Sequence, residues 1–235
     1  MALTKPGRIF MNMVNHNSAA PGQAKPLRSP AALRIPASLV SVLFHPLFFP
    51  LLLTCLVYIL APVSFAAVPR EVFMRWMAMI AINTLLLPLV VVLILKRLGF
   101  IESIRMTNIK DRIIPLIASM TFYFWAYQVA KGVKMPFLLN VLLLGNFWGI
   151  IALFIVSIFY KVSMHTTAAG GLLGIIIVLM IENPINMQVP FFIALLIAGM
   201  TGTARLILNA HSPGQVWLGY LIGILAQVGA YLFLL

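Results

Sequence analysis

The chain has 235 residues, of which 63% are hydrophobic and only 9% are charged. Soluble domains carry about 25% charged residues, so this composition excludes a soluble globular domain and favours a protein dissolved in a lipid bilayer. The 16 lysines and arginines exceed the 4 acidic residues, which gives a formal net charge of +12. Basic loops on the cytoplasmic side of a membrane account for that excess, and no nucleic-acid partner is expected.

The N-terminal residues 1–35 are polar and rich in Pro, Ser, Ala and basic residues. This composition predicts a flexible basic tail rather than a secretory signal. Residues 36–235 are predicted to form one transmembrane domain. The single cysteine, Cys55, allows no intrachain disulfide and no metal site built from thiolates.

Seven apolar runs follow the tail, each close to the length of about 20 residues that a helix needs to cross a bilayer. They are 38–62, 74–95, 115–130, 136–160, 166–181, 189–208 and 213–235. The runs are apolar on all sides and show no strand alternation. We therefore predict an all-α, polytopic membrane bundle of about six or seven transmembrane helices. The pairs Gly170/Gly174 and Gly219/Gly223 are expected to let helices approach closely.

Three polar clusters interrupt these runs, at residues 105–112, 161–166 and 205–215. They follow the second, fourth and sixth runs. Because two crossings separate each cluster from the next, all three are predicted to emerge on the same face of the membrane. Polar residues at the ends of membrane helices are the informative ones, so we take the clusters as parts of one site.

The residue types in the clusters suit a phosphate group. Arg105, Arg112 and Arg205 offer planar, bidentate hydrogen bonding. The second and third clusters each precede a predicted helix, whose N-terminus favours an anion through free N–H groups and its dipole. His165 and His211 lie at these helix starts, where one imidazole can act as a nucleophile and the other as a general acid.

In order and spacing, the clusters resemble the motifs of the type 2 phosphatidic acid phosphatase family, relatives of the vanadium-dependent haloperoxidases. The first motif appears as Arg105, six residues, Arg112, and the second as Val162-Ser163-Met164-His165. The third appears as Ala204-Arg205, five residues, His211, three residues, Gln215. The resemblance covers residues 100–225, and its third motif is the most specific.

The resemblance implies a membrane-embedded phosphatase that needs no metal ion and no cofactor, and that acts on a lipid phosphate or diphosphate within the cell membrane. His211 would attack phosphorus and form a phosphohistidine. His165 would protonate the leaving oxygen. The phosphate oxygens would be held by three arginines and by the backbone near a serine, namely Arg105, Arg112, Arg205 and Ser163.

Gln215 departs from the family pattern, which has an acidic residue that orients the nucleophilic histidine. An amide oxygen can accept the ring N–H but brings no negative charge, and loss of that charge in serine proteases lowers the rate about 10⁴-fold. Gln215 also fits position N3 of a capping box with Ser212. Val162 and Met164 are further departures. The alternative function is therefore a weakened or inactive member that binds lipid phosphates or acts as a membrane scaffold.

His45 lies inside the first run and is interpreted as a packed, hydrogen-bonded histidine. Lys161 is interpreted as an interfacial anchor whose stem lies along apolar surface. A transporter or channel, suggested only by His45 and the broken segment 181–189, ranks last. Twelve of the 16 basic residues fall on the side of the tail and the site. The charge distribution thus predicts a cytoplasmic site, whereas bacterial relatives of the family often work on the periplasmic face.

Overall fold

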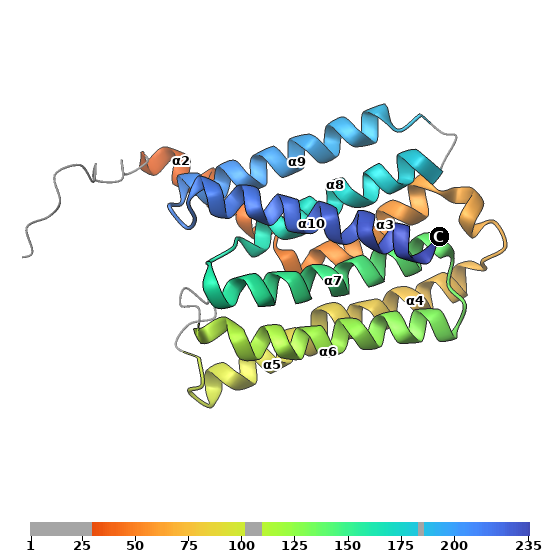
Figure 1. The fold of residues 1–235 in the computed structure, drawn as a ribbon, viewed down its shortest axis with the longest axis horizontal. Helices are drawn as coiled ribbons and strands as arrows, with labels where there is room; N and C mark the ends of the chain where they lie inside the picture. Colours follow the sequence, from red (N-terminus) through yellow and green to blue (C-terminus); the bar gives the residue numbers. More distant parts are fainter. Residues whose placement is uncertain (1–29, 102–109, 183–185) are drawn as a thin grey trace, which may run out of the picture.

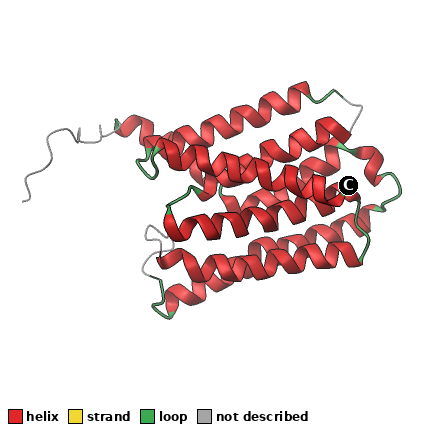
Figure 2. Cartoon of the chain, in the orientation of Figure 1, coloured by secondary structure: helices red, strands yellow, loops and turns green. Residues whose placement is uncertain are grey.

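The computed structural model describes residues 30–101, 110–182 and 186–235. These residues form helices and connecting turns without any strand (Figure 2), which confirms the predicted all-α class. Most of the predicted basic tail lies outside the described residues. Helix α2 begins at Ala31, a few residues before the predicted start of the transmembrane domain at residue 36.

The elements follow one another along a bundle of roughly antiparallel helices (Figure 1). In chain order they are α2 (Ala31–Leu43), η1 (Pro46–Phe48), α3 (Phe49–Leu60), η2 (Pro62–Phe65), α4 (Arg70–Ala81), η3 (Ile82–Leu86), α5 (Leu87–Arg97), α6 (Lys110–Gly132), α7 (Phe137–Phe159), α8 (Met164–Glu182), α9 (Gln188–Ile207) and α10 (Pro213–Leu234).

Seven helical segments of the described chain are long and apolar enough to cross a membrane, in agreement with the seven predicted runs. Two of them are composite. The first joins α2 to α3 through a break at Phe44–His45, and the second joins α4 to α5 through the π-helical turn η3. The composition and length of the helices indicate a multi-pass membrane protein. The breaks matter because irregular backbone at membrane depth is tolerated where it lines a cavity.

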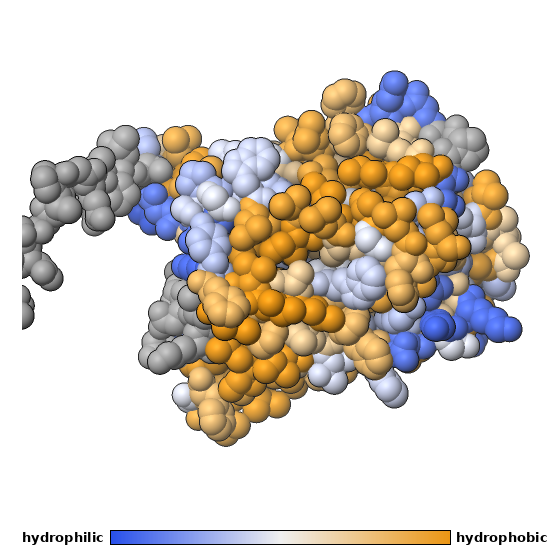
Figure 3. Space-filling view, in the orientation of Figure 1, coloured by the Kyte–Doolittle hydropathy of each residue, from blue (hydrophilic) through white to orange (hydrophobic). Residues whose placement is uncertain are grey.

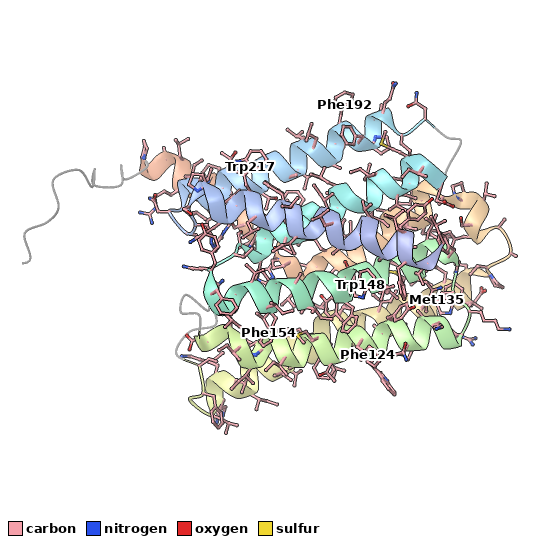
Figure 4. All side chains as sticks on the ribbon, in the orientation of Figure 1. Phe124, Met135, Trp148, Phe154, Phe192 and Trp217 are labelled. Atoms are coloured by element: carbon pink, nitrogen blue, oxygen red, sulfur yellow. The ribbon has the colours of Figure 1, made fainter. Side chains whose placement is uncertain are left out.

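The outer surface is suited to lipid. In Figure 3 apolar side chains cover the middle of the bundle and hydrophilic residues gather towards its two ends. Trp217 and Phe192 are largely exposed on α10 and α9, and Phe124 is partly exposed on α6 (Figure 4). Trp217 lies near the end of the bundle where α10 begins, the place where tryptophan is enriched at membrane interfaces.

Helices α8 and α10 pack most closely, and glycines make this possible. A Cβ atom added at Gly219 would meet Thr166, and one added at Gly223 would meet the backbone at Thr167 and Gly171. On α8, a Cβ at Gly170 would likewise meet the backbone of α10. The predicted packing role of these glycines is confirmed, and α8 is the most buried of the seven spans.

Helices α5, α7 and α9 end, and α6, α8 and α10 begin, at one end of the bundle, where α2 also begins (Figure 1). This is the arrangement that the crossing count predicted, and residues 105–109 of the first polar cluster lie outside the described residues. The C-terminus lies at the opposite end. The helix starts of α6, α8 and α10 therefore share one face of the molecule.

Candidate functional site

A cavity of about 1190 Å³ opens at this end of the bundle and extends into its interior. Its polar lining at the outer end includes residues from three separate parts of the chain: Arg112, Lys161, His165, Arg205 and His211. Much of the remaining lining is apolar, from α2, η1, α3 and α5 to α7. The predicted site residues of the second and third motifs thus meet at one cavity rather than being scattered over loops.

The spacing of Arg205 and His211 follows from how α9 ends. Asn209 adopts positive φ (51°), the left-handed conformation that asparagine tolerates better than most residues. The N–H of Ala210 donates to the carbonyl of Arg205 (3.1 Å), and the N–H of Asn209 donates to that of Leu206 (2.9 Å). This pair of bonds is a Schellman motif. It reverses the chain so that Arg205, in the last turn, and His211, just beyond it, line the same cavity.

The next residues start α10 and fix His211. Ser212 and Gln215 form a capping box, with Pro213 in the first turn, which confirms the predicted cap. His211 donates its Nδ1–H to Oε1 of Gln215 at 3.0 Å. The same oxygen accepts the backbone N–H of Ser212 at 3.2 Å. Two donors on one oxygen hold the amide in a single orientation, so Gln215 caps the helix and also sets the tautomer of His211, leaving Nε2 as the unprotonated nitrogen.

The start of α8 lies against the start of α10. Ser163 is fully buried, and its hydroxyl accepts the N–H of Thr166 (3.4 Å), as expected of a residue in the N-cap position. Its own N–H donates to the backbone carbonyl of Gln215 (3.4 Å). Ser163 therefore holds the two helix starts together and does not line the cavity. Two positive helix dipoles converge at the site as a result.

Arg112 reaches the site from the first turn of α6. It is almost fully buried, and its Nη1 donates to the carbonyl of Val162 at 3.1 Å. Lys161, in the same connection, lines the cavity. Burial, followed by the positive charges of Arg112 and Arg205, lowers the pKa of Lys161. Lys161 is thus part of the electrostatic environment of the arginines, closer to the site than the predicted anchor role implies.

Arg205 and His165 are joined by one residue of the first span. Arg205 donates from Nη1 to Oγ of Ser41 at 3.3 Å, and His165 donates from Nε2 to the carbonyl of Ser41 at 3.1 Å. The Nε atom of Arg205 is buried and has no hydrogen-bond partner among the described residues. A buried charged donor without a partner is destabilising, and an anion in the cavity would satisfy it.

The charge state of His211 suits a nucleophile. Burial lowers the pKa of His211 to about 4, and the hydrogen bond to Gln215 opposes this effect. The positive charges of Arg205, Arg112 and Lys161 lower the pKa further. Because the pKa lies well below neutrality, His211 carries no charge at pH 7, and its Nε2 has a free lone pair.

The sequence did not identify Ser41, and it placed His45 in a packing role only. The ring of His45 lies 5.4 Å from that of His165, edge to face, and both residues line the cavity. His45 is hydrogen bonded as predicted, accepting the N–H of Leu47 at Nδ1 (3.4 Å). The available signal was that His45 is an ionisable residue inside a span and directly precedes a proline. Ionisable groups within a span are functional candidates.

Four of the predicted site residues line the same cavity: Arg112, His165, Arg205 and His211. Ser163 and Gln215 do not line it, and Gln215 contacts it through its hydrogen bond with His211. Arg105 lies outside the described residues. Across the ranges that the structure describes, no cluster of three or more His, Cys, Asp or Glu side chains has the arrangement of a metal site.

The fold and the cavity define a multi-pass helical membrane protein with a cationic, histidine-bearing pocket at one end. A family model described as the PAP2 superfamily matches residues 156–235, which contain α8 to α10 with His165, Arg205 and His211. The match makes this part of the chain similar to that superfamily, in agreement with the family resemblance of its motifs. Searches of curated proteins and of solved structures found no match.

Proposed function

We propose that this protein is a membrane-embedded phosphatase that cleaves a lipid phosphate or diphosphate through a phosphohistidine intermediate on His211. The observation that carries the proposal is the tautomer of His211. Its Nδ1–H is donated to Gln215, its Nε2 is free, and the ring is neutral at physiological pH. An imidazole in this state, near the buried Arg112 and the half-buried Arg205, is arranged to attack phosphorus.

The phosphate would be held at the outer end of the cavity by Arg112, Arg205 and Lys161. The unpartnered Nε of Arg205 offers one charged hydrogen bond without disturbing the bond from Nη1 to Ser41. The adjacent starts of α8 and α10 add the positive ends of two helix dipoles. These cations stabilise the charge that develops on the equatorial oxygens in the transition state.

The reaction would proceed in two displacements. In the first, Nε2 of His211 forms a bond to phosphorus while the bond to the lipid oxygen breaks, and His165 gives that oxygen a proton. In the second, water attacks the phosphohistidine, His165 takes up a proton from the water, and inorganic phosphate leaves with the P–N bond broken. His165 thus ends the cycle in the protonation state in which it began.

A lipid is the substrate class that fits the cavity. The cationic end lies where α6, α8 and α10 begin, and the walls continue inward as apolar surface from α2, α3 and α7. Ends of membrane-spanning helices are expected at the depth of lipid headgroups. A phosphate ester with a hydrocarbon chain matches both parts. A small soluble phosphate ester would leave the apolar walls unused.

The deciding experiment compares phosphate release from lipid phosphates by the wild-type chain and by His211→Gln in detergent micelles without added metal. We expect the variant to lose at least about 10³-fold in kcat/KM, because the nucleophile is removed. His16→Gln is the matched control, since that histidine has no predicted role. Equal phosphate release by wild type and His211→Gln would refute the proposal.

The second candidate is a lipid-phosphate binder that has lost activity, and Gln215 is the observation that favours it. Gln215→Glu keeps the reach of the side chain and adds the negative charge that the family pattern has. A large gain in turnover would indicate a weakened phosphatase. Saturable binding of a lipid phosphate, with no turnover by either form, would instead support the binder.

The site is proposed to face the cytoplasm, because the crossing count along the sequence assigns 12 of the 16 basic residues to its side of the membrane. In a Cys55→Ser background, Phe100→Cys reports on the site end and Ala67→Cys on the opposite end, since both positions are exposed. A membrane-impermeant thiol reagent added to intact cells is expected to modify position 67 and to spare position 100. The reverse pattern would place the site on the outer face.

A further inference from the structure

The first membrane span, which lies outside the matched family segment, is broken beside the site. Helix α2 ends at Leu43, and His45 is extended (φ −72°, ψ 135°) before η1 starts at Pro46. A continuous helix would direct the N–H of His45 to the carbonyl of Ser41. Because the chain leaves the helix there, the Ser41 carbonyl is able to accept a bond from elsewhere, and the donor is His165.

A carbonyl oxygen has no proton to give, so the nitrogen of His165 that meets it must carry the hydrogen. That nitrogen is Nε2, at 3.1 Å. In the neutral ring the other nitrogen, Nδ1, is then the unprotonated one. His211 has the opposite arrangement, with its proton on Nδ1 and its lone pair on Nε2. Each ring thus has one nitrogen that donates its hydrogen to a neutral oxygen and one unprotonated nitrogen that is able to accept a proton or attack phosphorus.

Two further contacts fix this geometry. The ring of His45 contacts that of His165 in an edge-to-face arrangement, with the ring centroids 5.4 Å apart. The Ser41 hydroxyl accepts from Nη1 of Arg205, so a single residue aligns the second histidine with a phosphate-binding arginine. Ser41 is buried, and both Ser41 and His45 line the cavity.

We propose that the break from Ser41 to Pro46 is a positioning element of the active site, which holds His165 with its proton on Nε2 and makes Nδ1 the nitrogen that exchanges a proton with the substrate. The assignment of Nδ1 as the reacting atom rests on the phosphatase function proposed above. In the first displacement the ring is doubly protonated, and Nδ1–H passes its proton to the leaving lipid oxygen. In the second, Nδ1 recovers a proton from the attacking water, while Nε2–H stays on the Ser41 carbonyl throughout.

Ring-nitrogen NMR of the full chain, labelled with ¹⁵N-histidine, tests the proposal without any turnover. The nitrogen shifts show which ring atom bears the proton, and His45→Gln, His165→Gln and His211→Gln assign the signals. At pH 8 we expect His165 to be protonated on Nε2 and His211 on Nδ1. A His165 ring protonated on Nδ1 would overturn the proposal, whatever the activity of the protein.

Three variants connect the tautomer to catalysis. Ser41→Ala keeps the backbone carbonyl and removes the hydroxyl, so His165 should keep its Nε2 proton, while inorganic phosphate should bind more weakly by about 3-fold or more because Arg205 loses its alignment. His45→Ala removes the ring contact and should shift the His165 signals and lower kcat about 10-fold. His45→Phe retains a ring and should restore most of the rate. If His45→Ala changes neither signals nor rate, the break does not position His165.

Because these tests do not share a readout, the two proposals can fail separately. Phosphate release by His211→Gln at the wild-type rate would end the phosphatase proposal and leave the tautomers as measured. Loss of activity in His211→Gln together with an Nδ1-protonated His165 would support the phosphatase proposal and refute the proposed positioning role of the first span.

Discussion

The cavity has two polar ends of different character. The outer end gathers Arg112, Lys161 and Arg205 with two histidines, all close to helix ends. The inner end has neutral polar groups, among them the amides of Gln227 and Asn146, which lie well inside α10 and α7. Gln227 is 14 residues after the start of α10, about 20 Å deeper at 1.5 Å per residue.

The inner end is built by small residues as well as by polar ones. Gln227 donates from Nε2 to Oδ1 of Asn146 (2.9 Å), and its side chain occupies space that a Cβ at Gly145 or Gly174 would fill. Its Oε1 and the Nδ2 of Asn146 are buried without partners within the described part of the chain. The two ends differ because charged side chains are stable where headgroups and water can reach them, whereas the polar groups in the apolar middle are neutral.

Among the substitutions that compare the two ends, removal of the Arg205 guanidinium group at the outer end should have the largest effect. Arg205→Ala should lower kcat/KM for a lipid phosphate at least about 100-fold, the usual result of removing a donor that stabilises developing charge. Arg205→Lys should recover only part of the rate, because an ammonium group has no Nε–H and no planar fork. Steady-state kinetics measure both variants, with Arg70→Ala at the opposite end as the control. An Arg205→Ala enzyme within threefold of wild type would contradict the assigned site.

The second effect tests the packing of α8 against α10 between the two ends. A Cβ at Gly223 would meet backbone atoms of α8, so Gly223→Ala should destabilise the fold by about 2 kcal/mol through overpacking. Thermal unfolding in detergent measures the change. Gly199→Ala is the matched control, since no atom lies within 4 Å of its added Cβ, and it should be neutral or slightly stabilising. Equal unfolding temperatures for the two variants would show that α8 and α10 can separate without loss of stability.

The fold could be predicted from the sequence because a helix needs about 20 apolar residues to cross a bilayer. All seven runs became helical segments, and the glycines at 170, 174, 219 and 223 lie at close helix contacts. The break at His45 was less accessible. Pro46 and Pro50 favour a bend in this run, but the direction of the freed Ser41 carbonyl depends on the packing of α2 against α9 and on the distant His165.

The site was predictable where its residues are close in sequence. Arg205, His211 and Gln215 are fixed relative to one another by a helix end and a helix start, so their spacing encodes their geometry. Ser41 and His45 meet His165 across more than a hundred residues, and no local pattern specifies such a contact. The sequence also could not tell that Gln215 performs both roles considered for it, because both depend on the orientation of one amide.

The third effect concerns the pH profile at the outer end. Because the pKa of His211 is lowered from 6.5 to about 4, the ring stays neutral down to about pH 4, and the acid limb of kcat/KM that reports His211 should lie there rather than near 6.5. In Gln215→Glu the added negative charge favours the protonated ring, so the limb should move upward by about one pH unit. The ratio of the two profiles removes the ionisation of the substrate, which both share. A limb that does not move would mean that position 215 does not act on the nucleophile.

Substitutions of the two amides at the inner end should have the smallest effect. Gln227→Met should destabilise the fold by about 1 kcal/mol, because Asn146 Oδ1 loses its donor deep in the bundle. Adding Asn146→Leu removes the orphaned amide, and the double variant should regain stability, so a double-mutant cycle should give a coupling of about 1 kcal/mol. Phosphate release should stay within about threefold of wild type throughout, since neither amide contributes charge to the phosphate. A loss of activity comparable to that of Arg205→Ala would mean that the inner amides contact the substrate, and the cavity would then be one continuous recognition site rather than a cationic end above a neutral one.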